Sequence, residues 1–170
     1  MSMNSPSGAG EPLPTVTVWR TLLDTVFSLR QWIRPVFEAH GLTGPQWRVL
    51  RLLAEAGAPG MRLSDISEQL IHTPGNTTGI VDKLEERGLA ERHPHPEDRR
   101  ATLVRLTEAG RAVHAAVAPG FAERVEAVLS SLTAEERGVL QGMLERLREQ
   151  ARELAEGDSL GRGPDCSGRR

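Results

Sequence analysis

A helix signal followed at once by two short extended segments, within residues 73–106, restricts the folds open to this chain more than any other feature. Thr73 is a favoured helix N-cap, Pro74 occupies the first helical position, and Gly88 ends the helical pattern. LAERH and ATLVRL come next, and a loop with two prolines separates them. This pattern predicts a helix that leads directly into a β-hairpin.

Further helix signals flank this stretch on both sides. Apolar residues recur at helical spacing over residues 16–40, and Thr43 with Gln46 forms a capping box that starts a second helix. LSDISEQL predicts a short third helix, Thr107 caps a helix after the hairpin, and TAEE starts the last one. The fold class predicted is mainly α with a small β-hairpin wing, a winged helix-turn-helix with additional helices at both ends.

The helices at the two chain ends carry more apolar surface than a monomer of 170 residues needs. We expect a second copy to cover them, and a two-fold dimer would present two recognition helices about 34 Å apart, one turn of DNA. The predicted parts are a disordered extension (1–15), a winged-helix domain (16–156) with a DNA-binding region (43–106) and dimerisation helices (16–40 and 107–156), and a disordered tail (157–170).

Composition excludes several classes of protein. The formal net charge is −2 and the pI is near 6.2, so contacts with phosphate have to come from local groups of basic residues. The single cysteine, Cys166, excludes an internal disulfide framework and fits a reducing cytoplasm. No apolar run approaches the roughly 20 residues that span a bilayer. Without a nucleophile elbow, a phosphate-binding glycine loop or a Cys-x-x-Cys pair, we expect no enzyme and no cofactor.

The predicted hairpin loop, in ERHPHPEDRRATLVRL, carries the charge pattern of a DNA-binding wing. Arginine in a narrow minor groove is favoured by the negative potential there, and we assign that role to Arg100. Asp98 would be repelled by phosphate, so it is expected to hold an arginine by an ion pair. Arg99 is expected to contact the DNA backbone or to support the wing. His93 and His95 are expected to lie near flanking phosphates.

Two alternatives remain for this loop. His93 and His95 project to one side of an extended chain, and Glu97 or Asp98 adds a carboxylate, which is a pattern of metal ligands. A wing tip provides little rigid support for a third or fourth ligand, so we expect no metal. The other alternative is a solvated polar turn without a partner.

The helix that precedes the hairpin combines an apolar stripe with an outer face of small polar residues. The stripe contains Thr77, Ile80, Val81 and Leu84. Small hydrogen-bonding residues in an exposed first turn allow close approach to DNA bases. With the loop, the predicted DNA-binding residues are Thr73, Gly75, Asn76, Thr77, Thr78, Lys83, Arg92, His93, His95, Asp98, Arg99 and Arg100.

Four segments carry a family resemblance: GLTGPQWRVLRLLAE, LSDISEQL, TTGIVDKLEERGLAERHPHPEDRRATLVRLTEAGR and LTAEERGVLQGMLERL. Together they resemble the MarR family of bacterial transcriptional regulators over about residues 16–154. The most specific part is LEERGLAER…DRRATLVRLTEAG, where the Leu-Glu-x-x-Gly-Leu turn, the Asp-x-Arg wing and the Leu-Thr-x-x-Gly helix start occur at the family spacing.

The resemblance implies a homodimeric repressor on a pseudo-palindromic operator of double-stranded DNA, released by a small aromatic acid or phenol or by an oxidant. Asp98 and Arg100 match the Asp-x-Arg wing motif, and Gly75 to Thr78 match the start of the recognition helix. Gly79 replaces an arginine that contacts DNA in many members. Cys166 lies far from the position of the cysteine in peroxide sensors, and Arg48 replaces an aspartate of urate-responsive members, so neither signal is expected here.

In the family, effectors bind where the first helices and the dimer helices meet the winged domain. The residues expected there, which include three tryptophans able to stack on a ring and an arginine able to bind a carboxylate, are Trp19, Trp32, His40, Trp47 and Arg48. For each tryptophan, core packing is the alternative. Because acidic and basic residues balance between His72 and Arg105, an architectural or protein-interaction module without operator specificity or effector response is the alternative function.

Overall fold

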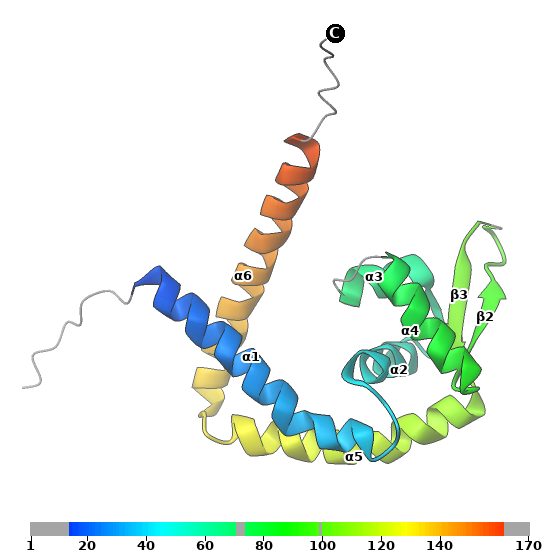
Figure 1. The fold of residues 1–170 in the computed structure, drawn as a ribbon, viewed down its shortest axis with the longest axis horizontal. Helices are drawn as coiled ribbons and strands as arrows, with labels where there is room; N and C mark the ends of the chain where they lie inside the picture. The colour runs from blue at the N-terminus through cyan, green and yellow to red at the C-terminus, as the bar shows by residue number, and fades with distance from the viewer. Residues whose placement is uncertain (1–13, 71–73, 99, 162–170) are drawn as a thin grey trace, which may run out of the picture. The chain divides into compact units, whose positions relative to one another are not determined.

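The computed structural model describes residues 14–70, 74–98 and 100–161, and the chain divides into two compact units, residues 1–125 and 126–170. Within the described residues, six helices and one small sheet confirm the predicted fold class, mainly α with a β-hairpin (Figure 1). The elements are α1 (Thr15–Glu38), α2 (Gly44–Ala56), β1 (Met61–Arg62), α3 (Leu63–Leu70), α4 (Pro74–Glu86), β2 (Ala90–Pro94), β3 (Thr102–Leu106), α5 (Glu108–Leu129) and α6 (Ala134–Gly161).

Side-chain caps set the starts of three helices where the sequence predicts them. Thr43 and Gln46 form the expected capping box at α2, in which Gln46 N donates to Thr43 Oγ1 and Thr43 N donates to Gln46 Oε1 at 2.9 Å. Gly110 N donates to Thr107 Oγ1 at 3.0 Å at the start of α5. Thr133 caps α6 in the same way. The predicted cap Thr73 lies outside the described residues.

The motif LEERGL ends α4 and starts the hairpin. Gly88 adopts a positive φ of 66°, which glycine reaches without steric cost. Leu89 N donates to Leu84 O at 2.8 Å, and Gly88 N donates to Glu85 O at 2.7 Å. These bonds satisfy carbonyls at the helix end and turn the chain directly into β2. Helix α4 and the hairpin are therefore joined by a short turn.

The sheet has three antiparallel strands in the order β1-β3-β2. The hairpin pairs Arg92 with Val104 and His93 with Leu103, and β1 adds Met61 opposite Val104 on the other edge of β3. The sequence analysis predicted the hairpin and missed β1, because two residues are too few to show an alternating pattern. The extra strand places Arg62 opposite Leu103, beside the hairpin turn.

The core of the first unit lies where α2, α3 and α4 pack against the sheet and the ends of α1 and α5. Each fully buried aliphatic side chain there contributes roughly 1.5–3 kcal/mol of transfer free energy. Three residues of the stripe predicted for α4, Ile80, Val81 and Leu84, are buried as expected. The core contains Phe37, Leu42, Trp47, Val49, Leu50, Leu52, Leu53, Ile66, Leu70, Ile80, Val81, Leu84, Leu89, Ala90, Val104, Leu106 and Val117.

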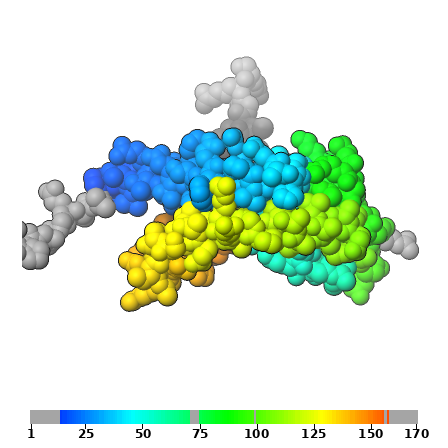
Figure 2. Space-filling model, turned by 90° about the horizontal axis from the view of Figure 1, so that it is seen from below, coloured from blue at the N-terminus to red at the C-terminus, as the bar shows by residue number. Residues whose placement is uncertain are grey.

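Helix α1 packs along the part of α5 that belongs to the first unit, and Figure 2 shows the two helices in contact. Trp32 Nε1 donates to the backbone carbonyl of Arg124 at 3.2 Å, and Arg124 Nη1 donates to that of Trp32 at 2.7 Å. The Arg124 guanidinium also lies 4.2 Å from the centre of the Trp32 ring, a cation–π distance. This reciprocal pair joins α1 to α5.

The second unit consists of the end of α5 and α6. Arg137 donates to the carbonyls of Leu129 and Leu132 and pairs with Glu126 at 3.2 Å, which holds the turn between the two helices. The rest of α6 exposes a row of large apolar side chains at helical spacing. They are Val139, Leu140, Met143, Leu144, Leu147 and Leu154.

The boundaries of the terminal helices differ slightly from the predicted domain limits. Helix α1 begins at Thr15, and α6 continues to Gly161, five residues into the stretch predicted as a disordered tail. Residues 1–13 and 162–170, with Cys166, lie outside the described part of the chain. Among the described helices, none is both long and apolar enough to cross a bilayer.

Candidate nucleic-acid interface and effector pocket

The first turn of α4 presents small polar groups to solvent. Gly75 and Asn76 are exposed, Thr78 is half-buried, and Lys83 is exposed further along the helix. Thr77 is the exception among the predicted contacts, because its side chain is completely buried. Its assignment to the DNA surface was therefore wrong, whereas its place in the inner stripe of α4 is correct.

A tight turn at the wing tip explains the Asp-x-Arg motif. Ala101 N donates to the carbonyl of Asp98 at 2.9 Å, and His95 N donates to the carbonyl of Ala101 at 3.0 Å. The carboxylate of Asp98 accepts the backbone N–H of Arg100 at 3.0 Å. Asp98 thus shapes the turn through hydrogen bonds to the main chain. Arg100 is exposed, and Arg99 lies outside the described residues.

Arg62 of β1 supports this turn from the neighbouring strand. Its Nη1 lies 3.8 Å from Asp98 Oδ2, and its Nη2 lies 3.3 Å from His95 Nε2. His95 Nδ1 in turn accepts the backbone N–H groups of Glu97 and Asp98, each at 3.2 Å. The arginine that Asp98 was expected to hold is therefore Arg62 in the described structure. The sequence analysis missed it because β1 was not predicted.

Arg92, predicted to contact phosphate, joins the wing to α4 in this structure. Its Nη1 lies 2.7 Å from Asp82 Oδ1 and also pairs with Glu85. Its backbone N donates to Glu85 Oε1 at 2.8 Å, and its Nη2 donates to the carbonyl of Thr78 at 3.4 Å. These contacts give Arg92 a structural role at the junction of the wing and α4, and its contact with phosphate stays a prediction.

The histidines of the wing lie close to neighbouring side chains and main chain. His93 Nε2 lies 2.9 Å from Glu91 Oε1, and the backbone donors at His95 Nδ1 leave the ring proton on Nε2, so the approach of Arg62 to Nε2 is a contact and not a hydrogen bond. Within residues 14–70, 74–98 and 100–161, no three histidine, cysteine or acidic side chains converge as metal ligands would. His93 and His95 remain predicted to lie near flanking phosphates.

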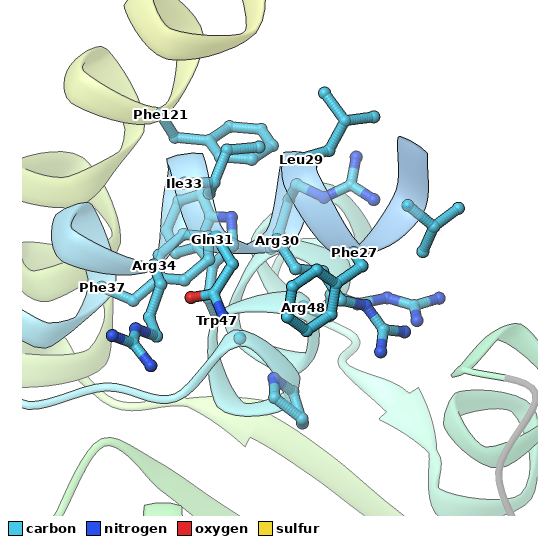
Figure 3. A pocket seen from close by; sticks show the side chains of 14 residues that line it. Phe27, Leu29, Arg30, Gln31, Ile33, Arg34, Phe37, Trp47, Arg48 and Phe121 are labelled. Atoms are coloured by element: carbon cyan, nitrogen blue, oxygen red, sulfur yellow. The ribbon is translucent and has the colours of Figure 1, made fainter. Parts of the chain in front are cut away.

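A cavity of about 720 Å³ lies between α1, α2 and α5 within the first unit. This volume lies within the range of small-molecule sites. Figure 3 shows aromatic rings from three helices on its walls, together with several guanidinium groups. The aromatic lining consists of Phe27, Phe37, Trp47 and Phe121, and the guanidinium groups belong to Arg30, Arg34, Arg48 and Arg51.

Stacked rings give the cavity a rigid floor. Trp47 is buried and stacks on Phe37 with ring centres 5.9 Å apart and on His114 at 5.1 Å. Phe121 completes the group, 5.5 Å from Trp47. The indole Nε1 of Trp47 is buried and has no hydrogen-bond partner among the described residues.

The charges around the cavity are only partly compensated. Arg34 pairs with Glu38 at 3.3 Å and Arg51 pairs with Glu55 at 3.2 Å, both within one helix turn. Arg48 Nη2 donates to the backbone carbonyl of Gln69 at 3.2 Å. Partial burial lowers the pKa of Arg48, and the positive charges of Arg51 and Arg30 lower it further. The neighbouring positive charges of Arg51 and Arg30 give this wall a positive potential that favours an anion.

A model of the MarR family matches residues 40–101. The HTH-type transcriptional regulator MhqR of Bacillus subtilis is 32% identical over 115 residues, which cover 68% of this chain and 78% of that protein. The chain belongs to the MarR family. The homoprotocatechuate degradative operon repressor of Escherichia coli is a further relative, 30% identical over 73% of this chain and 82% of that protein.

Solved MarR-family structures share the fold. AbsC, a MarR family transcriptional regulator from Streptomyces coelicolor, superposes with a TM-score of 0.77 and 24% identity, over 85% of this chain and 99% of its own. Membership in the family confirms the class predicted from the sequence, a winged-helix DNA-binding transcriptional regulator. The two relatives named above are regulators rather than enzymes.

The structure brings two of the five predicted effector residues of this MarR-family chain to the cavity, Trp47 and Arg48. Trp19 is exposed, Trp32 is held by Arg124, and His40 Nδ1 donates to the carbonyl of Val36, so none of these three lines it. The sequence analysis missed the other basic and aromatic residues. One signal could have indicated the arginines, namely their spacing of four residues at 30 and 34 and of three at 48 and 51. Residues at these spacings lie on the same face of a helix.

Proposed function

We propose that this MarR-family regulator is a homodimeric repressor that binds a pseudo-palindromic operator and is released by a small aromatic effector. The observation that supports DNA reading is the combination of an exposed, small first turn on α4 with an exposed Arg100 on a braced wing. Asn76 and Thr78 would contact bases in the major groove, and Arg100 would enter the minor groove. Lys83 and Arg99 would contact phosphates.

Dimerisation is supported by apolar helix surface in both units. In the first unit, α1 exposes Val16, Trp19 and Phe27 at 78%, 61% and 63%. In the second unit, α6 exposes Leu147 and Leu154 in the same way. Side chains of this size rarely stay in water as a continuous row. We assign both surfaces to contacts with a second copy, and the limits proposed for the dimerisation segments remain 16–40 and 107–156.

The effector is proposed to be an aromatic acid or phenol in the cavity between α1, α2 and α5. Stacked aromatic walls suit a ring, and the guanidinium groups suit a carboxylate or phenolate. The relative in Escherichia coli is named as the repressor of a homoprotocatechuate degradative operon, and homoprotocatechuate is an aromatic acid. We place the protein in the cytoplasm, where an operator would be found.

Titration of the purified protein onto the DNA upstream of its own gene, with random-sequence competitor, tests this function. We expect tight, salt-sensitive binding to one site and a dimer in size-exclusion chromatography with light scattering. Addition of hydroxybenzoates is expected to release the DNA. A monomer at working concentrations would contradict the proposal. Equal affinity for the upstream and random DNA would favour the architectural alternative.

A further inference from the structure

We propose that Arg48 transmits occupancy of the cavity to the DNA-binding helices, because its guanidinium both lines the cavity and binds the end of α3. An anion in the cavity and the carbonyl of Gln69 would compete for this one side chain. The inference rests on the proposed function, since it assumes an anionic effector in that cavity. It adds a residue and a mechanism of coupling that the proposed function leaves open.

The first step concerns the end of α3. The last carbonyls of a helix have no partner within the helix, and their partial negative charge favours a nearby cation. The last turn of α3 contains no basic residue of its own. Arg48, from α2, supplies the cation by donating to Gln69 O at 3.2 Å. The guanidinium of α2 therefore stabilises the end of α3.

The second step concerns the connection to DNA. Helix α4 begins at Pro74, five residues after Gln69, and its first turn carries Asn76. Helices α3 and α4 also pack directly against one another. A change at the end of α3 therefore acts on the helix turn that we assign to base contacts. The end of α3 and the start of α4 are close enough along the chain to be coupled.

The third step concerns the competition for Arg48. A carboxylate binds a guanidinium through two parallel charge-assisted bonds, which are stronger than one bond to a neutral carbonyl. A fork on the edge of the guanidinium that faces Gln69 uses the same N–H of Nη2 that now donates to the Gln69 carbonyl. Among the described residues, Arg48 has no carboxylate partner, whereas Arg34 and Arg51 each have one. An anion would bind Arg48, weaken its bond to α3 and reduce DNA affinity.

The test without effector compares two arginines that each donate to a backbone carbonyl of another element. Arg48→Met keeps the apolar stem and removes the donors, so we expect operator binding to weaken about tenfold, the effect that the effector itself would have. Arg105→Met is the matched control, because Arg105 donates to the carbonyl of Pro59 and is part of neither the cavity nor the contact to α3; binding is expected within about twofold of the parent. Equal loss in both variants, or no loss in either, overturns the coupling.

Arg48→Lys covers the case in which Arg48→Met does not fold, as judged by circular dichroism and thermal unfolding. Lysine keeps one donor for Gln69 O but cannot form the fork with a carboxylate. We expect nearly parental DNA binding without effector and a several-fold weaker response to an acid. A lysine variant that responds like the parent overturns the proposal.

The test with effector uses 4-hydroxybenzoate and the neutral 4-hydroxybenzamide as probes. In the parent, the acid is expected to lower operator affinity at least tenfold more than the amide, and Arg48→Met is expected to lose this difference. If the acid acts equally on parent and Arg48→Met, the coupling through Arg48 is wrong while the proposed effector site stands. If no hydroxybenzoate binds the parent, the effector part of the proposed function fails, and the comparison without effector still decides the role of Arg48.

Discussion

The guanidinium of Arg92 lies 2.7 Å from the carboxylate of Asp82, and the same group pairs with Glu85. These contacts join the second strand of the sheet to the helix that precedes it. Because Leu89 N also donates to Leu84 O, the main chain and the side chains hold the helix and the wing together. The two parts of the predicted DNA surface are thereby positioned as one element.

Replacement of Arg92 by alanine is expected to lower the free energy of unfolding by about 1–2 kcal/mol, since two half-exposed carboxylates lose their partner. Urea unfolding monitored by tryptophan fluorescence measures the change. The double variant Arg92→Ala with Asp82→Asn should recover part of the loss, because one unpaired charge is removed. Unchanged stability together with strongly weakened DNA binding would instead favour the phosphate contact that the sequence analysis assigned to Arg92.

Replacement of Arg100 by alanine is expected to weaken operator binding by about 1–3 kcal/mol, because this exposed side chain is assigned to the minor groove. Fluorescence anisotropy at several salt concentrations measures both the affinity and its salt dependence. Arg100→Lys keeps the charge and should retain an intermediate affinity. Parental affinity in Arg100→Ala would refute the assignment of the wing.

Arg62→Gln should weaken operator binding several-fold with little change in melting temperature. The substitution removes the ion pair to Asp98 and the contact to His95, so the turn that carries Arg100 loses its support. Arg105→Gln on the neighbouring strand is the control, since Arg105 bonds to the carbonyl of Pro59 and does not contact the turn. An equal effect of both substitutions would mean that general charge, and not support of the turn, determines the result.

Gly110→Ala should destabilise the protein by about 1–3 kcal/mol. A Cβ at this position would lie 1.9 Å from the carbonyl oxygen of Leu89, so α5 and the start of β2 would have to separate. Gly79→Ala is the matched control in another helix, where a Cβ meets nothing within 4 Å, and it should stabilise the protein by up to about 1 kcal/mol. Thermal or urea unfolding of the two variants shows whether each substitution raises or lowers the free energy of unfolding. A neutral Gly110→Ala would show that the close approach is not required.

The start of α6 should lose stability in acid. The backbone N–H and then the hydroxyl of Thr133 lower the pKa of Glu136. Because the pKa of Glu136 is lower in the folded chain than in the unfolded chain, its ionised carboxylate stabilises the fold. This stabilisation is complete above the unfolded-state pKa and disappears as the pH falls through the folded-state pKa. Unfolding of the parent and of Glu136→Gln between pH 3 and 7 is the measurement. The difference between the free energies of unfolding of the two proteins should shrink at the acid end. A difference that stays constant with pH would contradict the prediction.

Local chemistry allowed most of the helices and the hairpin to be predicted. Thr43 and Thr107 start helices because a hydroxyl accepts the N–H three residues ahead, a relation contained within four residues of sequence. Gly88 ends α4 for an equally local reason. Strand β1 could not be predicted, because its pairing with β3 depends on residues about forty positions away.

The partners of the charged side chains were decided only by the tertiary structure. Arg92 and Arg100 look alike in sequence, yet one is held by Asp82 and Glu85 while the other is exposed. The cavity likewise depends on the crossing of α1, α2 and α5, which leaves Trp19 in solvent and brings Arg48 to the wall. Hydrogen bonds between neighbours and helical periodicity are fixed by the order of residues. Which distant carboxylate, carbonyl or ring a side chain meets depends on how the elements pack, because electrostatic and stacking contacts require a few ångströms of separation in space.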